Sequence, residues 1–106
     1  MAVQSCLVLM LWLCSSCSEN SDATWVREAG GRTGQELYLL NCASCHGEQG
    51  DLGVSGAKNL RASVLNPVAI QTIVRNGKNA MPAFKGIITE QSSYDSLVTY
   101  VISLRN

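Results

Sequence analysis

Two cysteines and a histidine in the middle of the chain limit what this sequence can fold around. Cys42 and Cys45 are three positions apart, and His46 follows directly. Side chains three positions apart on a helical turn share a face, so both thiols can reach the two vinyl groups along one haem edge. The imidazole of His46 then lies over the ring centre, where it can bind iron. The spacing is typical of a covalent attachment site for c-type haem.

Two other chemistries use paired cysteines. A thioredoxin-like dithiol has the same spacing, but it lies at a strand-to-helix junction of an α/β chain. A zinc site needs four ligands, and His46 is the only histidine, so there is no second Cys/His pair. Haem attachment is the favoured interpretation, and the alternatives are a redox dithiol or a chance occurrence of the spacing.

The composition agrees with a small domain built around a cofactor. The chain has 106 residues, enough for one domain, and only 6% of them are aromatic. A core this small usually needs additional stabilisation, which a covalently held haem would provide. The 8 basic and 8 acidic residues balance, which gives no support to nucleic-acid binding.

The first residues have the pattern of an export signal. Positions 6–14 are apolar, and the small residues Ser15 and Ser16 follow. Spanning a bilayer takes about 20 apolar residues, so this run is too short. We expect residues 1–16 to be a signal peptide, although no Lys or Arg precedes the run. The alternative is a buried helix of the mature domain.

Cys17 directly follows the small residues, as in a lipoprotein processing site where cleavage leaves a lipidated cysteine. The usual leucine three positions earlier is Cys14 here, so simple cleavage without lipid is the alternative. Both outcomes place the mature protein in the bacterial cell envelope, on the periplasmic side. Residues 17–32 are mostly polar and predict a tether; residues 33–106 form the domain.

The first helix of the domain has a clear start. Thr33 and Glu36 form a capping box, and the helix is expected to run to about Cys45. Gly34 and Tyr38 are four positions apart and share a face. A glycine on that face would let another helix approach closely.

Two further helices are expected. Asn66 as N-cap and Pro67 at the first position begin the second, and Gly77 ends it. Thr89 is the expected cap of the last helix, which runs to the C-terminus. Both carry an apolar face at helical spacing. These faces comprise Ile70, Ile73 and Val74, and then Tyr94, Leu97, Val98, Val101 and Leu104.

The stretch from 47 to 65 has no helix or strand pattern and predicts a loop. It would wrap the His46 side of the haem. A carbonyl near Ala57 or Lys58 would accept the second ring hydrogen of the histidine and so fix its tautomer. Leu60 would pack on the ring.

Met81 is the only methionine outside the predicted signal. Its thioether suits the sixth position on haem iron, and it lies on a loop beside Pro82. With a single histidine, a bis-His site cannot form. The alternatives are a core-filling methionine, or ligation by a deprotonated Lys78 or Lys85.

These features together resemble the class I c-type cytochromes, in particular the small single-haem bacterial type. The resemblance covers residues 33–106. It implies an all-α fold with about three main helices and long loops around one haem c, bound covalently through Cys42 and Cys45. The implied iron ligands are His46 and Met81. The family usually has a proline in the loop that orients the histidine, and residues 56–60 contain none.

The resemblance implies a monomeric one-electron carrier rather than an enzyme, because two axial ligands saturate the iron. The alternatives are a haem subunit of a larger membrane or periplasmic oxidoreductase, and a catalytic or sensing haem from which Met81 departs.

Five basic residues and no acidic one lie between Leu52 and Thr89, which predicts steering of an acidic redox partner. The five are Lys58, Arg61, Arg75, Lys78 and Lys85.

Overall fold

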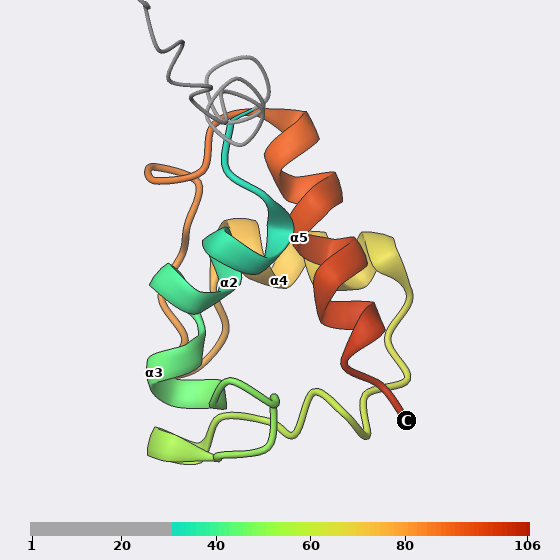
Figure 1. Ribbon diagram of the computed structural model, residues 1–106. Coiled ribbons are helices and arrows are strands. Elements are labelled where there is room, and N and C mark those ends of the chain that lie inside the picture. The colour runs from blue at the N-terminus through green and yellow to red at the C-terminus, as the bar shows by residue number, and fades with distance from the viewer. Residues whose placement is uncertain (1–30) are drawn as a thin grey trace, which may run out of the picture.

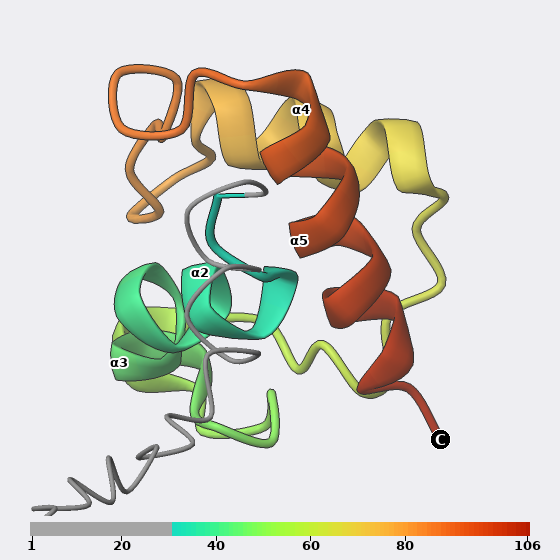
Figure 2. The same ribbon diagram turned by 45° about the horizontal axis from the view of Figure 1, so that its top comes forward.

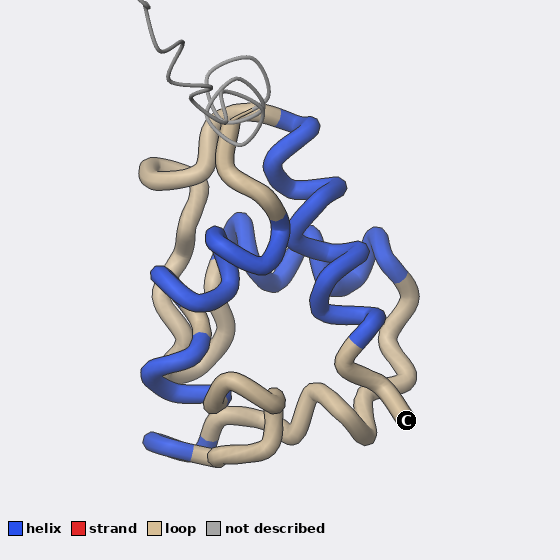
Figure 3. The backbone as a smooth tube through the Cα atoms, in the orientation of Figure 1, coloured by secondary structure: helices blue, strands red, loops and turns tan. Residues whose placement is uncertain are grey.

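The computed structural model describes residues 31–106. This part of the chain is all-helical, as predicted, with three longer helices: α2 (Gly34–Asn41), α4 (Pro67–Asn76) and α5 (Gln91–Ser103) (Figure 1). A single turn, α3 (Ala43–His46), follows α2, and a 3-10 turn, η1 (Val54–Gly56), lies in the loop after it. Residues 31–106 contain no strand (Figure 3).

The expected signal (1–16) and almost all of the tether (17–32) lie outside the described residues. No helix within 31–106 is long and apolar enough to cross a membrane.

The crossing of α2 and α5 is the tightest contact between helices. A Cβ atom built on Gly34 would lie 2.0 Å from the Ser96 carbonyl oxygen, so only glycine allows this approach. One turn further on, the rings of Tyr38 and Tyr100 pack at 5.2 Å between centroids. The predicted close approach of another helix to the Gly34 face is therefore confirmed, and that helix is α5.

The core lies where α5 packs against both α2 and α4 (Figure 2). Tyr38, Tyr94 and Leu97 are fully enclosed. Of the predicted apolar positions, most are buried, while Ile73 and Leu104 are half-buried. Phe84 and Ile88, on the loop between α4 and α5, complete this core.

The predicted start of α4 is confirmed. The Asn66 side chain accepts a hydrogen bond from the Ala69 amide at 2.8 Å, Pro67 occupies the first helical position, and Gly77 caps the end. The capping box is also present, since the Glu36 amide donates to the Thr33 hydroxyl at 3.2 Å.

Two predicted boundaries are wrong. The first helix does not continue to Cys45, because Cys42 has a φ of −117° and separates α2 from α3. The last helix is preceded by Glu90 rather than Thr89, and no side chain caps it. The Thr89 hydroxyl instead lies 3.4 Å from the Glu90 carboxylate. Both errors concern one local turn and leave the helix order unchanged.

Candidate functional site

A cavity of about 920 Å³ lies between the helices and the two long loops. Its size is in the range of pockets that hold cofactors. Residues from α2, α3, α4, α5 and both loops line it, and the lining is mainly apolar. All four predicted site residues, Cys42, Cys45, His46 and Met81, are among them.

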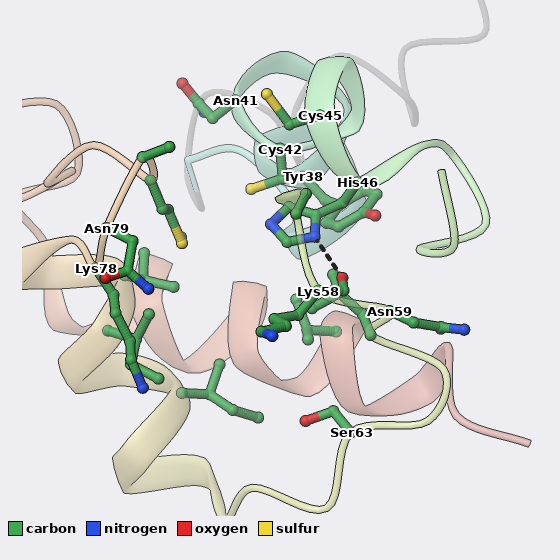
Figure 4. A pocket seen from close by; sticks show the side chains of 18 of the residues that line it. Tyr38, Asn41, Cys42, Cys45, His46, Lys58, Asn59, Ser63, Lys78 and Asn79 are labelled. Atoms are coloured by element: carbon green, nitrogen blue, oxygen red, sulfur yellow. Dashed lines mark hydrogen bonds between the residues drawn. The ribbon is translucent and has the colours of Figure 1, made fainter. Parts of the chain in front are cut away.

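The break at Cys42 determines how the two thiols lie. Cys42 is at the junction of α2 and α3 and is 8% exposed, whereas Cys45 is exposed. Both are free thiols and both line the cavity. Figure 4 shows them on the same side of the cavity as His46. The three residues of the motif are thus brought together as predicted.

The ring of His46 is fixed by one hydrogen bond. Its Nδ1 atom lies 2.9 Å from the Lys58 carbonyl oxygen, drawn as the dashed line in Figure 4. A carbonyl can only accept, so Nδ1 must carry the hydrogen. In the neutral imidazole this leaves Nε2 with a free lone pair, which is the form that binds a metal. The predicted acceptor near Ala57 or Lys58 is confirmed as Lys58.

The loop that carries this carbonyl is held in shape by further hydrogen bonds between its own residues. The Leu60 amide donates to the Gly50 carbonyl at 2.8 Å, and the Ala57 amide donates to Val54 at 2.9 Å. The Asn59 side chain accepts from the Arg61 amide at 3.0 Å. The acceptor for His46 is therefore set in a loop of defined shape although it contains no proline.

Burial controls the ionisation of two groups at this site. It raises the pKa of the Cys42 thiol to about 11, with a smaller effect from the neighbouring Cys45. It also raises the pKa of Tyr38 to about 12, with a smaller effect from Cys42. Reactive dithiols have a thiol whose pKa is lowered. Burial has the opposite effect on Cys42, and the two thiols lie at a junction between two helices rather than between a strand and a helix, so the setting does not match a thioredoxin-like dithiol.

Met81 approaches the cavity on the loop that follows α4. It is half-buried, packs against the core and lines the cavity. Lys78 and Asn79 of the same loop lie across the cavity from His46 in Figure 4. Lys78 also lines the cavity, whereas Lys85 does not, which leaves Lys85 poorly placed as an alternative ligand.

The five basic residues are not equivalent. Lys58, Lys78 and Lys85 are exposed. The Arg75 guanidinium lies 3.9 Å from the centre of the Tyr94 ring and donates to Gln91 at 2.6 Å. Arg61 donates to the Asn106 side chain. The two arginines therefore take part in contacts within the fold, and the three lysines remain available to a partner.

Sequence reasoning missed part of the cavity wall. Val54, at the start of η1, and Ser63, Val64 and Leu65, just before α4, line the cavity. It also missed that the Tyr38 hydroxyl donates to the Gly47 carbonyl at 2.6 Å. The four wall residues and Gly47 lie outside the three longer helices, so no periodic pattern in the sequence marks them, and their path depends on distant contacts.

Comparisons with known proteins identify the family. A family profile described as "Cytochrome C oxidase, cbb3-type, subunit III" matches residues 29–101. Cytochrome c6 of Leptolyngbya boryana is 35% identical over 80 residues, covering 70% of this chain and 92% of the relative. Cytochrome c6 of Pyropia tenera is 37% identical over 76 residues, covering 66% and 87%.

A solved structure shows the same fold. Cytochrome c6 of the diatom Phaeodactylum tricornutum superposes with a TM-score of 0.56 at 29% identity, covering 66% of this chain and 87% of that one. The chain therefore belongs to the c-type cytochromes, in the family that this profile describes. As a member it carries covalently bound haem c and serves as a small electron carrier, not as an enzyme.

Proposed function

We propose that Cys42 and Cys45 hold the haem through thioether bonds and that His46 and Met81 are its axial ligands. The residues present suit this group. Two free thiols and an imidazole line one side of an apolar cavity, and a thioether lines the same cavity from a different loop. When bound, the haem supplies the iron that takes up and releases one electron.

The observation that carries the assignment is the hydrogen bond between His46 and Lys58. It holds the imidazole with Nδ1 protonated, so that Nε2 remains free to act as a ligand. Met81, on the loop between α4 and α5, would occupy the remaining coordination position of the iron. A thioether in this position raises the reduction potential relative to a second histidine. With both positions filled, no substrate reaches the iron, which suits electron transfer alone.

An absorption spectrum tests cofactor and ligation together. The full chain would be produced in a host that attaches haem c, and the oxidised and reduced forms recorded. We expect a reduced c-type spectrum and a weak far-red band in the oxidised form, which is characteristic of Met–S ligation. A c-type spectrum without that band would refute Met81 as ligand while leaving the attachment intact.

The proposal includes a redox partner with an acidic face in the bacterial cell envelope. The support is the exposure of Lys58, Lys78 and Lys85, two of which line the cavity. Basic groups around a cavity rim raise the rate of encounter with an acidic surface. The proposed carrier works as a monomer on the periplasmic side.

Anchoring through Cys17 is a separate part of the proposal. Cys17→Ser would release the protein from membranes if a lipid is attached there. Ser21→Thr in the polar tether, which leaves Ser15, Ser16 and Cys17 unchanged, serves as a control and should stay membrane-bound. If wild-type protein is already in the soluble envelope fraction, the anchor is refuted and simple cleavage is supported.

A second candidate function is a haem subunit of a larger oxidase. It is favoured by the matching profile, whose description names subunit III of a cbb3-type oxidase. Val68 is 72% exposed and does not line the cavity, so apolar surface is available near the start of α4. Purification in mild detergent distinguishes the two. A stable stoichiometric partner supports the subunit, and a monomer supports the free carrier.

A further inference from the structure

The loop that carries Met81 makes a tight turn directly after the end of α4. Two main-chain hydrogen bonds, each 3.0 Å long, join Lys78 and Met81 in both directions and close a tight turn. Asn79 in this turn has a φ of +53°, a conformation that most side chains disfavour. The methionine therefore lies at the end of a turn whose shape is set by the backbone.

The same loop is bound to α4 on its far side. The Phe84 amide donates to the Val74 carbonyl at 2.9 Å, and the Lys85 amide donates to Arg75 at 3.3 Å. Phe84 itself is buried in the core. The segment from 78 to 85 is thus fixed at both ends to the last turn of one helix.

Gly77 lies at the point where a side chain would collide with this turn. Its φ is +74°, and a Cβ atom there would lie 2.6 Å from the Met81 carbonyl oxygen and 2.9 Å from the Ala83 amide nitrogen. Both neighbours are backbone atoms, so they can move away only if the whole turn shifts. A side chain at position 77 would displace the backbone of Met81 itself.

We propose that Gly77 is a positioning residue for the sixth iron ligand: the space left by its missing side chain lets the Lys78–Met81 turn close and fixes the methionine before the haem is bound. This inference rests on the proposed ligation by Met81. It adds that the strength of the Met81 bond to iron is set in part by a residue that does not touch the iron.

The test uses competition with imidazole. Added imidazole and Met81 compete for the same coordination position, so the apparent affinity for imidazole rises as the methionine bond weakens. In the oxidised holoprotein we expect Gly77→Ala to bind imidazole about tenfold more tightly than wild type, since local backbone strain is large enough for such a change. The far-red band should weaken in parallel.

Two glycine controls separate the possible causes. Gly31 has a φ of +70° but no atom within 4 Å of a built Cβ, and it does not line the cavity, so Gly31→Ala carries the backbone cost without a collision. Gly86 lies in the same loop as Met81 and is equally open. Both variants should bind imidazole within about twofold of wild type. If they change as much as Gly77→Ala, the effect is general loosening and the inference is wrong.

A milder pair covers the case in which Gly77→Ala does not fold. Asn79 is exposed, and Asn79→Gly keeps a residue that tolerates positive φ whereas Asn79→Ala does not. We expect tighter imidazole binding for the alanine variant only. Equal affinities for the two variants would contradict the inference.

Met81→Ala distinguishes failure of this inference from failure of the proposed ligation. If Met81→Ala leaves the spectrum and the imidazole affinity unchanged, the ligand itself has been misassigned. If Met81→Ala opens the position but Gly77→Ala binds imidazole as wild type does, the ligand stands and the role of Gly77 is refuted.

Discussion

The two sides of the cavity are built differently. On the His46 side, the motif on α2 and α3 carries two thiols and an imidazole within five residues, and a carbonyl 12 positions away holds the imidazole. On the Met81 side, a single thioether is the one proposed iron ligand, and it lies on a loop. That loop is shaped by main-chain hydrogen bonds and a glycine at its start.

Only one of the two sides can release the haem iron without losing the covalent attachment. In the proposed holoprotein, two covalent bonds and one iron bond hold the first side, so losing any one leaves the others. The second side depends on one soft ligand. Its position rests on a turn between Lys78 and Met81 and on the close contact with Gly77. We therefore expect haem retention to depend on the first side, and reduction potential and ligand access to depend on the second.

Removing both thiols should have the largest effect. In the double variant Cys42→Ala and Cys45→Ala, no thioether can form, so all covalent haem should be lost. Acid–acetone extraction followed by absorption spectroscopy measures this loss, and each single variant should retain less covalent haem than wild type. Covalent haem in the double variant would mean that the attachment site lies elsewhere.

Opening the second side should change the potential but not the attachment. In Met81→Ala we expect intact covalent haem, loss of the far-red band and a fall in reduction potential on the order of 0.1 V, within the roughly 0.8 V that axial ligands span. Spectroelectrochemistry measures both. An unchanged spectrum would exclude Met81 and direct attention to Lys78.

A smaller change on the first side should affect stability and not the potential. Tyr38→Phe removes the hydroxyl that donates to the Gly47 carbonyl at 2.6 Å, directly after His46. Leaving this part-buried acceptor without its partner should lower the free energy of unfolding by about 1 kcal/mol. Guanidinium unfolding measures the loss. Tyr100→Phe on the facing ring, for which no comparable bond joins the hydroxyl to this loop, is the matched control.

The smallest effect should come from the charge of the rim. Lys78→Glu should slow electron exchange with an acidic partner severalfold at low salt while the potential changes little, because it weakens steering rather than the iron site. The difference should vanish as salt rises, since charges are screened over about 8 Å at physiological ionic strength. Stopped-flow rates at several salt concentrations measure it. Arg61→Gln, at a residue engaged with Asn106, should have less effect.

The features that depend on neighbours within a few positions could be predicted from the sequence. The attachment motif follows from a spacing of three, and the starts of α2 and α4 follow from caps at Thr33 and Asn66. Gly34 could be recognised as a packing position because it shares a helical face with Tyr38. Each of these signals is complete within about one helical turn, so it can be interpreted without knowing where the rest of the chain lies.

The contacts between distant parts of the chain could not be predicted from the sequence and are seen in the tertiary structure. That the Lys58 carbonyl holds His46, that Ser96 closes against Gly34 and that Gly77 faces the backbone of Met81 all depend on how the loops and helices pack. The break at Cys42 and the engagement of Arg75 with Tyr94 are of the same kind. Every residue has a carbonyl group and every glycine lacks a side chain. The sequence pattern alone therefore does not reveal which carbonyl accepts a hydrogen bond or which glycine allows a close contact.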